Sequence, residues 1–467
     1  MKRFATLLVV LILVLSTSAF AQYNFYDYDF LGGGARAQGM GKAYYAVSDD
    51  ITAGTWNPAG LIAIDKPVLG LSWSSLSPSG KSNVTVFESI TGNHSGSFGD
   101  ISSLNFVAPI RIKGHPFALS LSYNLNFTTF SQSDLAISDQ VNFSYYTPSL
   151  GVLVDTNDIY INQNLSMEGG VRSLNLGFGT RIYDNLMFGF STNVYTGHSL
   201  LKQISDVNIY DLRYQDLVQR GDDNIHTTLI DTNKFEGLNF TLGFKYIKEK
   251  MNLALIIKTP FELKVNRERS IYTITRFNGL IEDNGTDTTY FNDLLLKYEM
   301  PLMLGFGASY QASENLMLAG DIEYRGFSGK KVLNRVGVTI NPSGDNEEEF
   351  VEIDPNWSNV ITFRVGGEYL LHRDFGTIPI RTGFSMVPMA DQDVDMNGNF
   401  TQPVQYNFSL GTGIHWEQIS LDIGYTYEMK DRSFYQLTFD DLLGPLAVSS
   451  DFEDRNHHFT VSFTGVF

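Results

Sequence analysis

The sequence predicts an all-β protein, namely a transmembrane antiparallel β-barrel of about fourteen strands. Three observations support this fold: two-residue periodicity, connections that alternate in length, and aromatic residues at one end of the strands. Beyond residue 21, no segment approaches the roughly 18 consecutive apolar residues that a membrane-spanning helix needs. The chain is nevertheless rich in aromatic residues, with 24 Tyr and 34 Phe, which suits transmembrane strands better than helices.

The periodicity is clearest at 117–127, where large apolar residues face one way and Ala, Ser and Asn the other. The C-terminal segment 457–467 has the same pattern and ends on Phe467. A strand in the wall of a membrane barrel needs an apolar face toward lipid and a polar face toward a water-filled lumen. Apolar and polar residues could also alternate in an edge strand of a soluble β-sandwich. The predicted strands are 68–76, 101–109, 117–130, 171–182, 186–198, 237–247, 251–264, 300–310, 315–325, 360–370, 378–386, 404–416, 418–429 and 457–467.

The connections favour the barrel over the sandwich. Short turns, such as 183–185 and 248–250, alternate with long connections at 77–100, 131–170, 199–236, 265–299, 326–359, 387–403 and 430–456. Bacterial barrels have short periplasmic turns and long outer loops, whereas a sandwich has no reason to sort its loops this way. The periplasmic ends of the descending strands also carry outward aromatic residues, as an interfacial girdle requires: Tyr246, Tyr310, Tyr369, Trp416 and Phe467.

The N-terminus predicts export. Lys2 and Arg3 precede an apolar run at 7–15, and Ala19-Phe20-Ala21 forms a cleavage pattern, so residues 1–21 are expected to be a signal peptide. The chain contains no cysteine, which excludes disulfides. Its formal net charge of −18 argues against a nucleic-acid partner. The barrel is expected to occupy residues 67–467.

Residues 22–66 fit no strand pattern. Their glycine cluster is not a phosphate-binding loop, because Arg36 and Ala43 stand where that motif needs Gly and Ser or Thr. The stretch from Gly34 to Leu61 instead resembles the N-terminal hatch of the outer-membrane long-chain fatty acid transporter family (FadL/TodX type). The resemblance implies a hatch at 22–66 that plugs the lumen. The motif residues are Gly34, Arg36, Gly39, Gly41, Asn57, Pro58 and Ala59.

The resemblance further implies a bacterial outer-membrane channel for passive uptake of long-chain fatty acids or other hydrophobic molecules. A non-transport scaffold or secretion accessory on the same barrel is the alternative, and a polar-solute porin is disfavoured because a hatch should block a constant channel. Expected partners are outer-membrane lipid, a hydrophobic small-molecule substrate and, through Phe467, the barrel assembly machinery. The resemblance also implies that substrate leaves the lumen sideways through the wall near a kinked third strand. The segment 117–130 shows no readable kink, so the sequence does not support this exit route.

A fatty acid channel needs a cation for the carboxylate and an apolar surface for capture. The cations on the inward parity are Arg364, Arg181, Lys245 and Arg381. Most of them are expected instead to form structural ion pairs with the inward carboxylates Asp321, Glu323, Glu368 and Asp422 or with the hatch. The candidate capture residues lie in the loop 131–170 and are Phe143, Tyr145, Tyr146 and Leu150. The alternative role for these apolar residues is structural: the outer loops would pack on each other and cap the barrel.

No cofactor is expected, and the only metal candidate is a weak calcium loop. Asp393, Asp395 and Asn397 match its opening D-x-D-x-N-G pattern, but Val404 stands at the twelfth position, where calcium loops have Glu. An enzyme is not expected, because no G-x-S-x-G, H-E-x-x-H or paired-cysteine motif occurs.

Overall fold

The computed structural model describes residues 33–467 except 86–88, 129–130, 140–142, 148–151, 157, 211–212, 215–222, 278–284, 341–345, 396 and 441–443. In some strand segments that flank these gaps, only the backbone is described. The predicted signal peptide and the first part of the predicted hatch lie outside the described residues. No helix in the described part of the chain is both long and apolar enough to cross a membrane.

The chain forms a closed antiparallel barrel of 14 strands, as predicted. The last strand pairs with the first, from Val68 opposite Val466 to Ser77 opposite His457, which confirms the expected closure. The wall consists of β1 (Val68–Ser77), β4 (Phe98–Ile112), β5 (His115–Thr128), β9 (Asp158–Tyr183), β10 (Leu186–Tyr210), β12 (Asp223–Lys248), β13 and β14 (Met251–Lys258, Phe261–Phe277), β15 and β16 (Gly285–Met300, Met303–Gln311), β17 (Leu316–Arg325), β20 (Val360–Arg373), β21 (Gly376–Pro388), β24 (Val404–His415), β25 (Ile419–Asp440) and β26 (Gly444–Val466).

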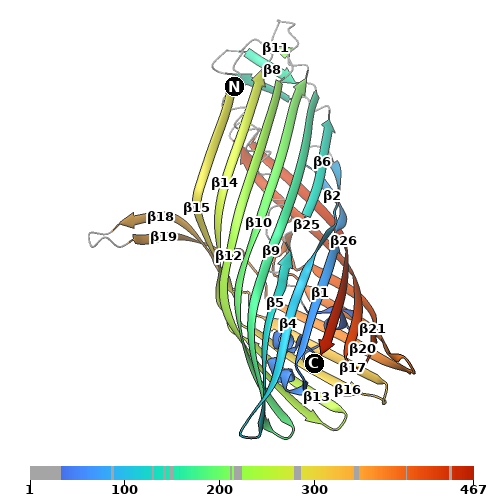
Figure 1. The fold of residues 1–467 in the computed structure, drawn as a ribbon. Coiled ribbons are helices and arrows are strands. Elements are labelled where there is room, and N and C mark those ends of the chain that lie inside the picture. Colours follow the sequence, from blue (N-terminus) through green and yellow to red (C-terminus); the bar gives the residue numbers. More distant parts are fainter. Residues whose placement is uncertain are drawn as a thin grey trace.

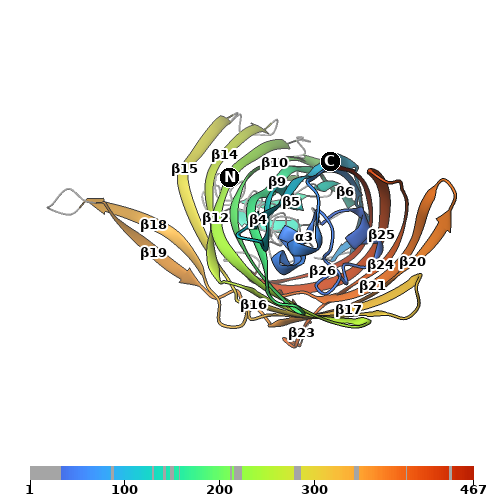
Figure 2. The same ribbon diagram turned by 60° about the horizontal axis from the view of Figure 1, so that its bottom comes forward.

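Smaller elements decorate this wall. A hairpin of β18 (Val332–Ile340) and β19 (Asn346–Ile353) projects sideways from the barrel (Figure 1). Inside the barrel lie α2 (Ala35–Gly39), α3 (Ala53–Trp56) and the 3₁₀ helix η1 (Pro58–Ala63), as Figure 2 shows. The remaining strands are β2 (Ser79–Thr85), β3 (Ser89–Ser95), β6 (Ser131–Asp139), β7 (Phe143–Thr147), β8 (Val152–Thr156), β11 (Arg213–Tyr214), β22 (Asp393–Val394) and β23 (Phe400–Thr401).

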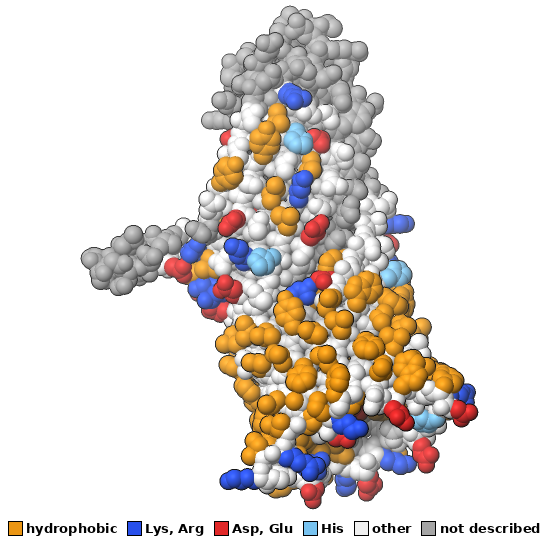
Figure 3. Space-filling model, in the orientation of Figure 1, with side chains coloured by type: hydrophobic (Ala, Val, Ile, Leu, Met, Phe, Trp, Pro, Cys, Tyr) orange, Lys and Arg blue, Asp and Glu red, His pale blue; other side chains and the backbone are white. Residues whose placement is uncertain are grey.

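An apolar belt covers the half of the barrel that contains the C-terminus on the face drawn in Figure 3, and exposed apolar residues of the other wall strands continue it. It consists of the predicted outward residues; Leu410, for example, is 61% exposed. Of the predicted girdle residues, Tyr310, Tyr369, Trp416 and Phe467 are exposed, and Tyr246 is half-buried. The inward positions of the same strands carry buried Ser, Thr and Asn side chains. This arrangement suits lipid outside and a polar interior.

Above the belt the two faces exchange character. On β12, Leu238 and Phe240 face outward in the belt, but further up Phe235 and Leu229 are buried inside while Glu236 is exposed. The predicted long connections at 131–170, 199–236, 265–299 and 430–456 are therefore largely strand, and that part of the prediction is wrong. Their alternation is apolar-in and polar-out, as water on the outside requires, which is opposite to the pattern of the lipid-facing strands.

Two prolines divide the seventh and eighth strands. Pro260 separates β13 from β14, and Pro301 separates β15 from β16, because proline has no N–H for the ladder. Above this level, β15 pairs with β18 only from Leu296 to Tyr298. Among the described residues, no other strand bonds to this edge of β15.

The third strand, β5, contains an irregularity that the sequence pattern did not indicate. Its register with β9 shifts between Leu125 and Phe127. The neighbours Leu125 and Asn126 are both buried, at 2% and 3% exposure, whereas regular alternation would turn one of them outward. A β-bulge has this effect on side-chain direction. The bulge at Asn126 could not be read from the alternation of 117–130.

Candidate functional site

Residues 33–66 fill the inside of the belt region (Figure 2), and we call them the hatch segment. Its Asn57-Pro58-Ala59 turn is completely buried. The Asn57 side chain accepts a hydrogen bond from the Ala59 N–H at 3.1 Å and donates one to the Tyr45 carbonyl at 3.0 Å. Asn at the N-cap and Pro at the first position are the residues that start a helix best, so this turn also begins η1.

Glycines on three neighbouring strands make room for this turn. Gly179, Gly189 and Gly243 lie opposite one another on β9, β10 and β12 and face inward. A Cβ atom at Gly189 would lie 2.1 Å from the carbonyl carbon of Pro58, and one at Gly243 would lie 2.2 Å from Asn57 Oδ1. We call these three residues the glycine seat. The backbone of the turn thus rests directly on the barrel wall.

The opposite wall holds α2 in a similar way. A Cβ atom at Gly383 would lie 2.1 Å from the Gly41 nitrogen, and one at Gly366 would lie 2.2 Å from the Met40 carbonyl oxygen. Gly41 itself has a φ of 62°, a conformation that glycine adopts readily. The predicted motif residues Gly39 and Gly41 therefore allow close approach to the wall, while Gly34, with a φ of 82°, precedes α2.

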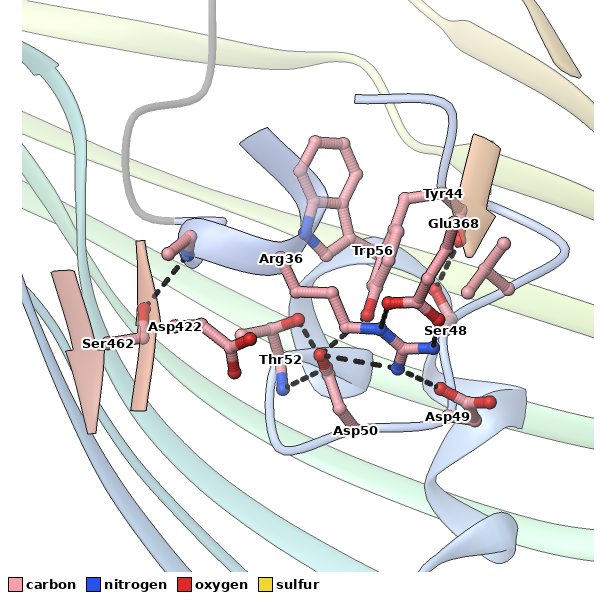
Figure 4. A network of polar contacts seen from close by, with 12 residues as sticks. Arg36, Tyr44, Ser48, Asp49, Asp50, Thr52, Trp56, Glu368, Asp422 and Ser462 are labelled. Carbon is pink, nitrogen blue, oxygen red and sulfur yellow. Dashed lines mark hydrogen bonds and ion pairs between the residues drawn. The ribbon is translucent and has the colours of Figure 1, made fainter. Parts of the chain in front are cut away.

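Ion pairs join the hatch segment to this same wall (Figure 4). Arg36 donates from Nε and Nη2 to both oxygens of Glu368, at 3.0 and 2.8 Å, and from Nη1 to Asp49 at 2.6 Å. Burial alone would lower the pKa of Arg36, but Asp49 and Glu368 raise it well above its ordinary value. Arg381 continues the network, donating to Glu368 and to Asp422 at 2.6 Å each.

Asp321 of β17 provides a second attachment. Its Oδ2 accepts the backbone N–H groups of Tyr44 and Tyr45 at 2.6 and 3.0 Å. The Tyr45 hydroxyl donates to Glu323, which also pairs with Arg364 at 3.0 Å. Burial raises the pKa of Tyr45 well above its ordinary value, so this hydroxyl stays a donor. Charged groups of β17 and β20 therefore bind the hatch segment, and Arg381 of β21 and Asp422 of β25 extend the network behind Glu368.

The structure locates the four predicted carboxylate ligands. Arg364 and Arg381 are buried in the ion pairs described above, and Lys245 donates to the Val47 carbonyl at 2.5 Å. Arg181 is exposed, two residues before the end of β9. The first three thus have the structural contacts that the alternative interpretation expects. Binding of a carboxylate by any of the four stays a prediction.

A cavity that is partly open to solvent lies above the hatch segment. Its apolar lining includes Phe261, Met300 and Phe327, and its polar lining includes Asn193 and Asn239. Two cations also line it, Lys258 and Arg325. Neither is among the predicted cations, although Lys258 shares the inward parity of Ala254 and Ile256 on β13 and could have been found by it.

A buried apolar cluster continues from this cavity into the outer half of the barrel. It includes Phe235, Leu263, Val265 and Trp357, and the cavity residues Met300 and Phe327 belong to it. Trp357 packs edge-on against Phe327, with ring centroids 5.7 Å apart. A ligand in the cavity would therefore contact an apolar cluster that extends into the outer half of the barrel.

The predicted capture residues are not tested by the structure. Phe143, Tyr145 and Tyr146 lie on β7, of which only the backbone is described. Leu150 lies outside the described residues. Apolar capture by this segment stays a prediction.

The candidate calcium ligands are bonded to protein groups. Asp393 accepts from the Ser433 N–H at 2.7 Å and from Arg432 at 3.4 Å. Asp395 accepts from the side chain and backbone of Asn399, at 2.8 Å each, which lowers its pKa. Among the described residues, no group of three or more His, Asp or Glu side chains could hold a metal ion. The D-x-D-x-N-G pattern here forms a turn closed by Asp395.

We expect calcium to leave this loop unchanged, because its carboxylates already accept protein hydrogen bonds. Isothermal titration of the purified protein with CaCl₂ should give no saturable heat. A saturable signal that disappears in Asp395→Asn would contradict this interpretation.

Comparison with known proteins identifies the family. Residues 31–467 match the model of the outer membrane protein transport protein family (OMPP1/FadL/TodX). The chain belongs to this family. Among solved structures it is similar to a Pseudomonas aeruginosa FadL homologue (14% identity, 94% of this chain and 98% of that chain, TM-score 0.57). It is likewise similar to the P. putida toluene transporter TodX (15% identity, 94% and 99%, TM-score 0.58) and to the monoaromatic hydrocarbon channel CymD (14%, 94% and 99%, TM-score 0.52). No curated protein matches the sequence.

The chain is therefore an outer-membrane channel protein for hydrophobic compounds, as predicted at this coarser level. Its family comprises transport channels and is not an enzyme class. The similarity to the solved structures supports the fold, because identities of 14–15% are too low to transfer a substrate.

Proposed function

We propose that this FadL/TodX-family channel takes up amphipathic hydrophobic compounds, long-chain fatty acids among them, through the cavity above the hatch segment. The observation that supports this proposal most directly is the lining of the cavity, which combines Phe261, Met300 and Phe327 with two cations. Burial of apolar surface contributes roughly 25 cal/mol per Å², so an alkyl chain in this apolar lining gains affinity with each carbon it buries.

The cations favour a compound with an acidic head over a neutral hydrocarbon. Lys258 and Arg325 line the cavity together with polar residues such as Asn193 and Asn239. A hydrogen bond to a charged group contributes about 1.5–3 kcal/mol, enough to separate the affinities of an acid and a hydrocarbon of the same size. We choose Lys258 as the position to alter, because methionine is a neutral replacement of nearly the same length as lysine.

Replacing Lys258 with methionine tests this proposal. Methionine keeps the length and apolar character of the side chain while removing its charge. We expect the dissociation constant for dodecanoate to rise about tenfold, equivalent to 1.4 kcal/mol, and that for toluene to change little. Titration calorimetry on the detergent-solubilised protein measures both.

Lys331→Met is the matched control, because Lys331 pairs with Asp354 outside the barrel wall. Equal loss of dodecanoate and toluene affinity in Lys258→Met would contradict acid recognition by this residue. Undiminished binding of either ligand after the cavity is filled by Met300→Trp would contradict the cavity as the uptake site.

A further inference from the structure

Cations gather on one side of the barrel rim, at the end that carries the C-terminus. The turns that join β4 to β5, β9 to β10 and β12 to β13 follow one another along this rim, because β5 pairs with β9 and β10 with β12. These turns and the strand ends beside them carry five exposed cations and two exposed carboxylates, Asp184 and Glu249. We call the five cations the basic sector: Arg111, Lys113, Arg181, Lys248 and Lys250.

The other side of this rim is acidic. The turns that join β16 to β17, β20 to β21 and β24 to β25 carry exposed Glu314, Asp374 and Glu417, and Arg373 is their one arginine or lysine. The chain as a whole has a formal net charge of −18, so the basic sector is not an average property of its surface. A shell of lipid that merely surrounds the barrel would contact the rim on every side. The one-sided distribution therefore indicates a localised site for an anion.

No protein group neutralises the basic sector. Within the described part of the chain, none of its five side chains forms an ion pair or a hydrogen bond. The cations inside the barrel differ in this respect, because Arg364 pairs with Glu323 and Arg381 with Glu368. The basic sector thus has its charge available for a ligand.

Two arginines of the basic sector lie within reach of one phosphate group. Arg111 of β4 pairs with Pro116 of β5, and the next residue of β5, Phe117, pairs with Thr180 of β9. Arg181 therefore follows two strand spacings away, which amounts to about 10 Å. Arginine side chains are long, and the planar guanidinium group suits phosphate oxygens.

The backbone at Lys113 is a second observation that points to a ligand. Ile112 pairs with His115 across a two-residue turn in which Lys113 has a φ of 51° and Gly114 one of 81°. Asn, Asp and Gly are the residues that such a turn favours, and a lysine with positive φ is strained. A contact between its ammonium group and an anion would offset that strain.

The basic sector adjoins the apolar belt. Ile112 and Ile182 are 54% and 46% exposed on the outward side of β4 and β9, and each is next to a cation in the sequence. Figure 3 shows Lys and Arg side chains below the belt at this end of the barrel. A lipid whose acyl chains lie along the belt would hold its headgroup at this level.

We propose that the basic sector binds the phosphate group of an anionic glycerophospholipid, such as phosphatidylglycerol, in the membrane leaflet at this end of the barrel. Arg111 and Arg181 donate to the phosphate oxygens, and the three lysines provide further positive charge. Ile112 and Ile182 contact the acyl chains. This lipid is a structural partner and is distinct from the compounds that enter the cavity above the hatch segment.

Native mass spectrometry of the detergent-solubilised protein with equal amounts of dioleoyl phosphatidylglycerol and dioleoyl phosphatidylcholine tests the site. We expect the native protein to retain phosphatidylglycerol with about tenfold preference, because the choline group cancels the phosphate charge of the other lipid. Arg181→Gln and Lys113→Asn should each lower this preference about fivefold. Arg373→Gln is the matched control, because it removes an exposed arginine from the acidic side of the same rim.

Folding of each variant is checked by heat-dependent gel mobility. Asparagine suits the positive φ at position 113, so a loss of lipid in Lys113→Asn is not a folding defect. Equal retention of the two lipids by the native protein overturns the site, as does an unchanged preference in both folded variants or an equal loss in Arg373→Gln. Displacement of phosphatidylglycerol by an equal concentration of polyglutamate would assign the basic sector to an acidic protein and overturn the lipid proposal.

Discussion

Replacing Gly189 with valine is expected to displace the Asn57-Pro58-Ala59 turn from the glycine seat and open the barrel. A side chain at this position would begin 2.1 Å from the Pro58 carbonyl carbon and 2.2 Å from the Ala59 nitrogen. Overpacking commonly costs about 1–3 kcal/mol, and here the obstacle is backbone, which cannot move aside as a side chain can. Valine itself suits a β-strand, so the wall should still form.

Planar-bilayer recording measures the result. The native protein should show little steady conductance, whereas Gly189→Val should conduct continuously. Gly320→Val is the control, because a Cβ atom at Gly320 would have no neighbour closer than 3.6 Å. A folded Gly189→Val protein with the native conductance would show that the turn does not need the glycine seat.

Replacing Glu368 with alanine is expected to release the hatch segment from the charged wall. Glu368 bonds to Arg36 and to Arg381 at once, so its loss leaves two neighbouring guanidinium groups without the carboxylate between them. Removing one partner of a buried ion pair destabilises by about 3–5 kcal/mol. Glu368→Gln keeps part of the hydrogen bonding and should have an intermediate effect.

Limited trypsin digestion reports the release, because Arg36 and Lys42 lie within the hatch segment and are shielded by the barrel. Cleavage there should increase in the order native, Glu368→Gln, Glu368→Ala. Glu352→Ala, on the projecting hairpin, is the control. Equal protection in all four proteins would show that the glycine contacts alone hold the segment.

The membrane-embedded part of the fold could be predicted from sequence because each strand has one face toward lipid and one toward a polar interior, which requires apolar and polar residues to alternate. The alternation at 117–127, the turn at 183–185 and the terminal Phe467 all follow from lipid on one side and a polar interior on the other. The closing pair of β1 with β26 follows in turn, since an even strand number leaves both ends on the same side.

The outer half of the barrel and the cavity could not be predicted in this way. At 223–236 the apolar residues face inward. The lipid-facing strand pattern places them outward, so this segment was predicted to be a loop. Cavity residues such as Lys258, Phe261 and Phe327 come from separate strands and loops. They line the cavity near the strand breaks at Pro260 and Pro301, which the alternation pattern did not indicate. The partners of Arg364 and Arg381 depend likewise on cross-strand register, which a single sequence does not determine.

Crystals soaked with 12-bromododecanoate provide the most direct test of the cavity as the site of hydrophobic uptake. We expect anomalous bromine density among the apolar side chains next to Phe261 and Phe327, with the carboxylate toward Lys258. Bromine density confined to the outer apolar belt, with none in the cavity, would contradict it.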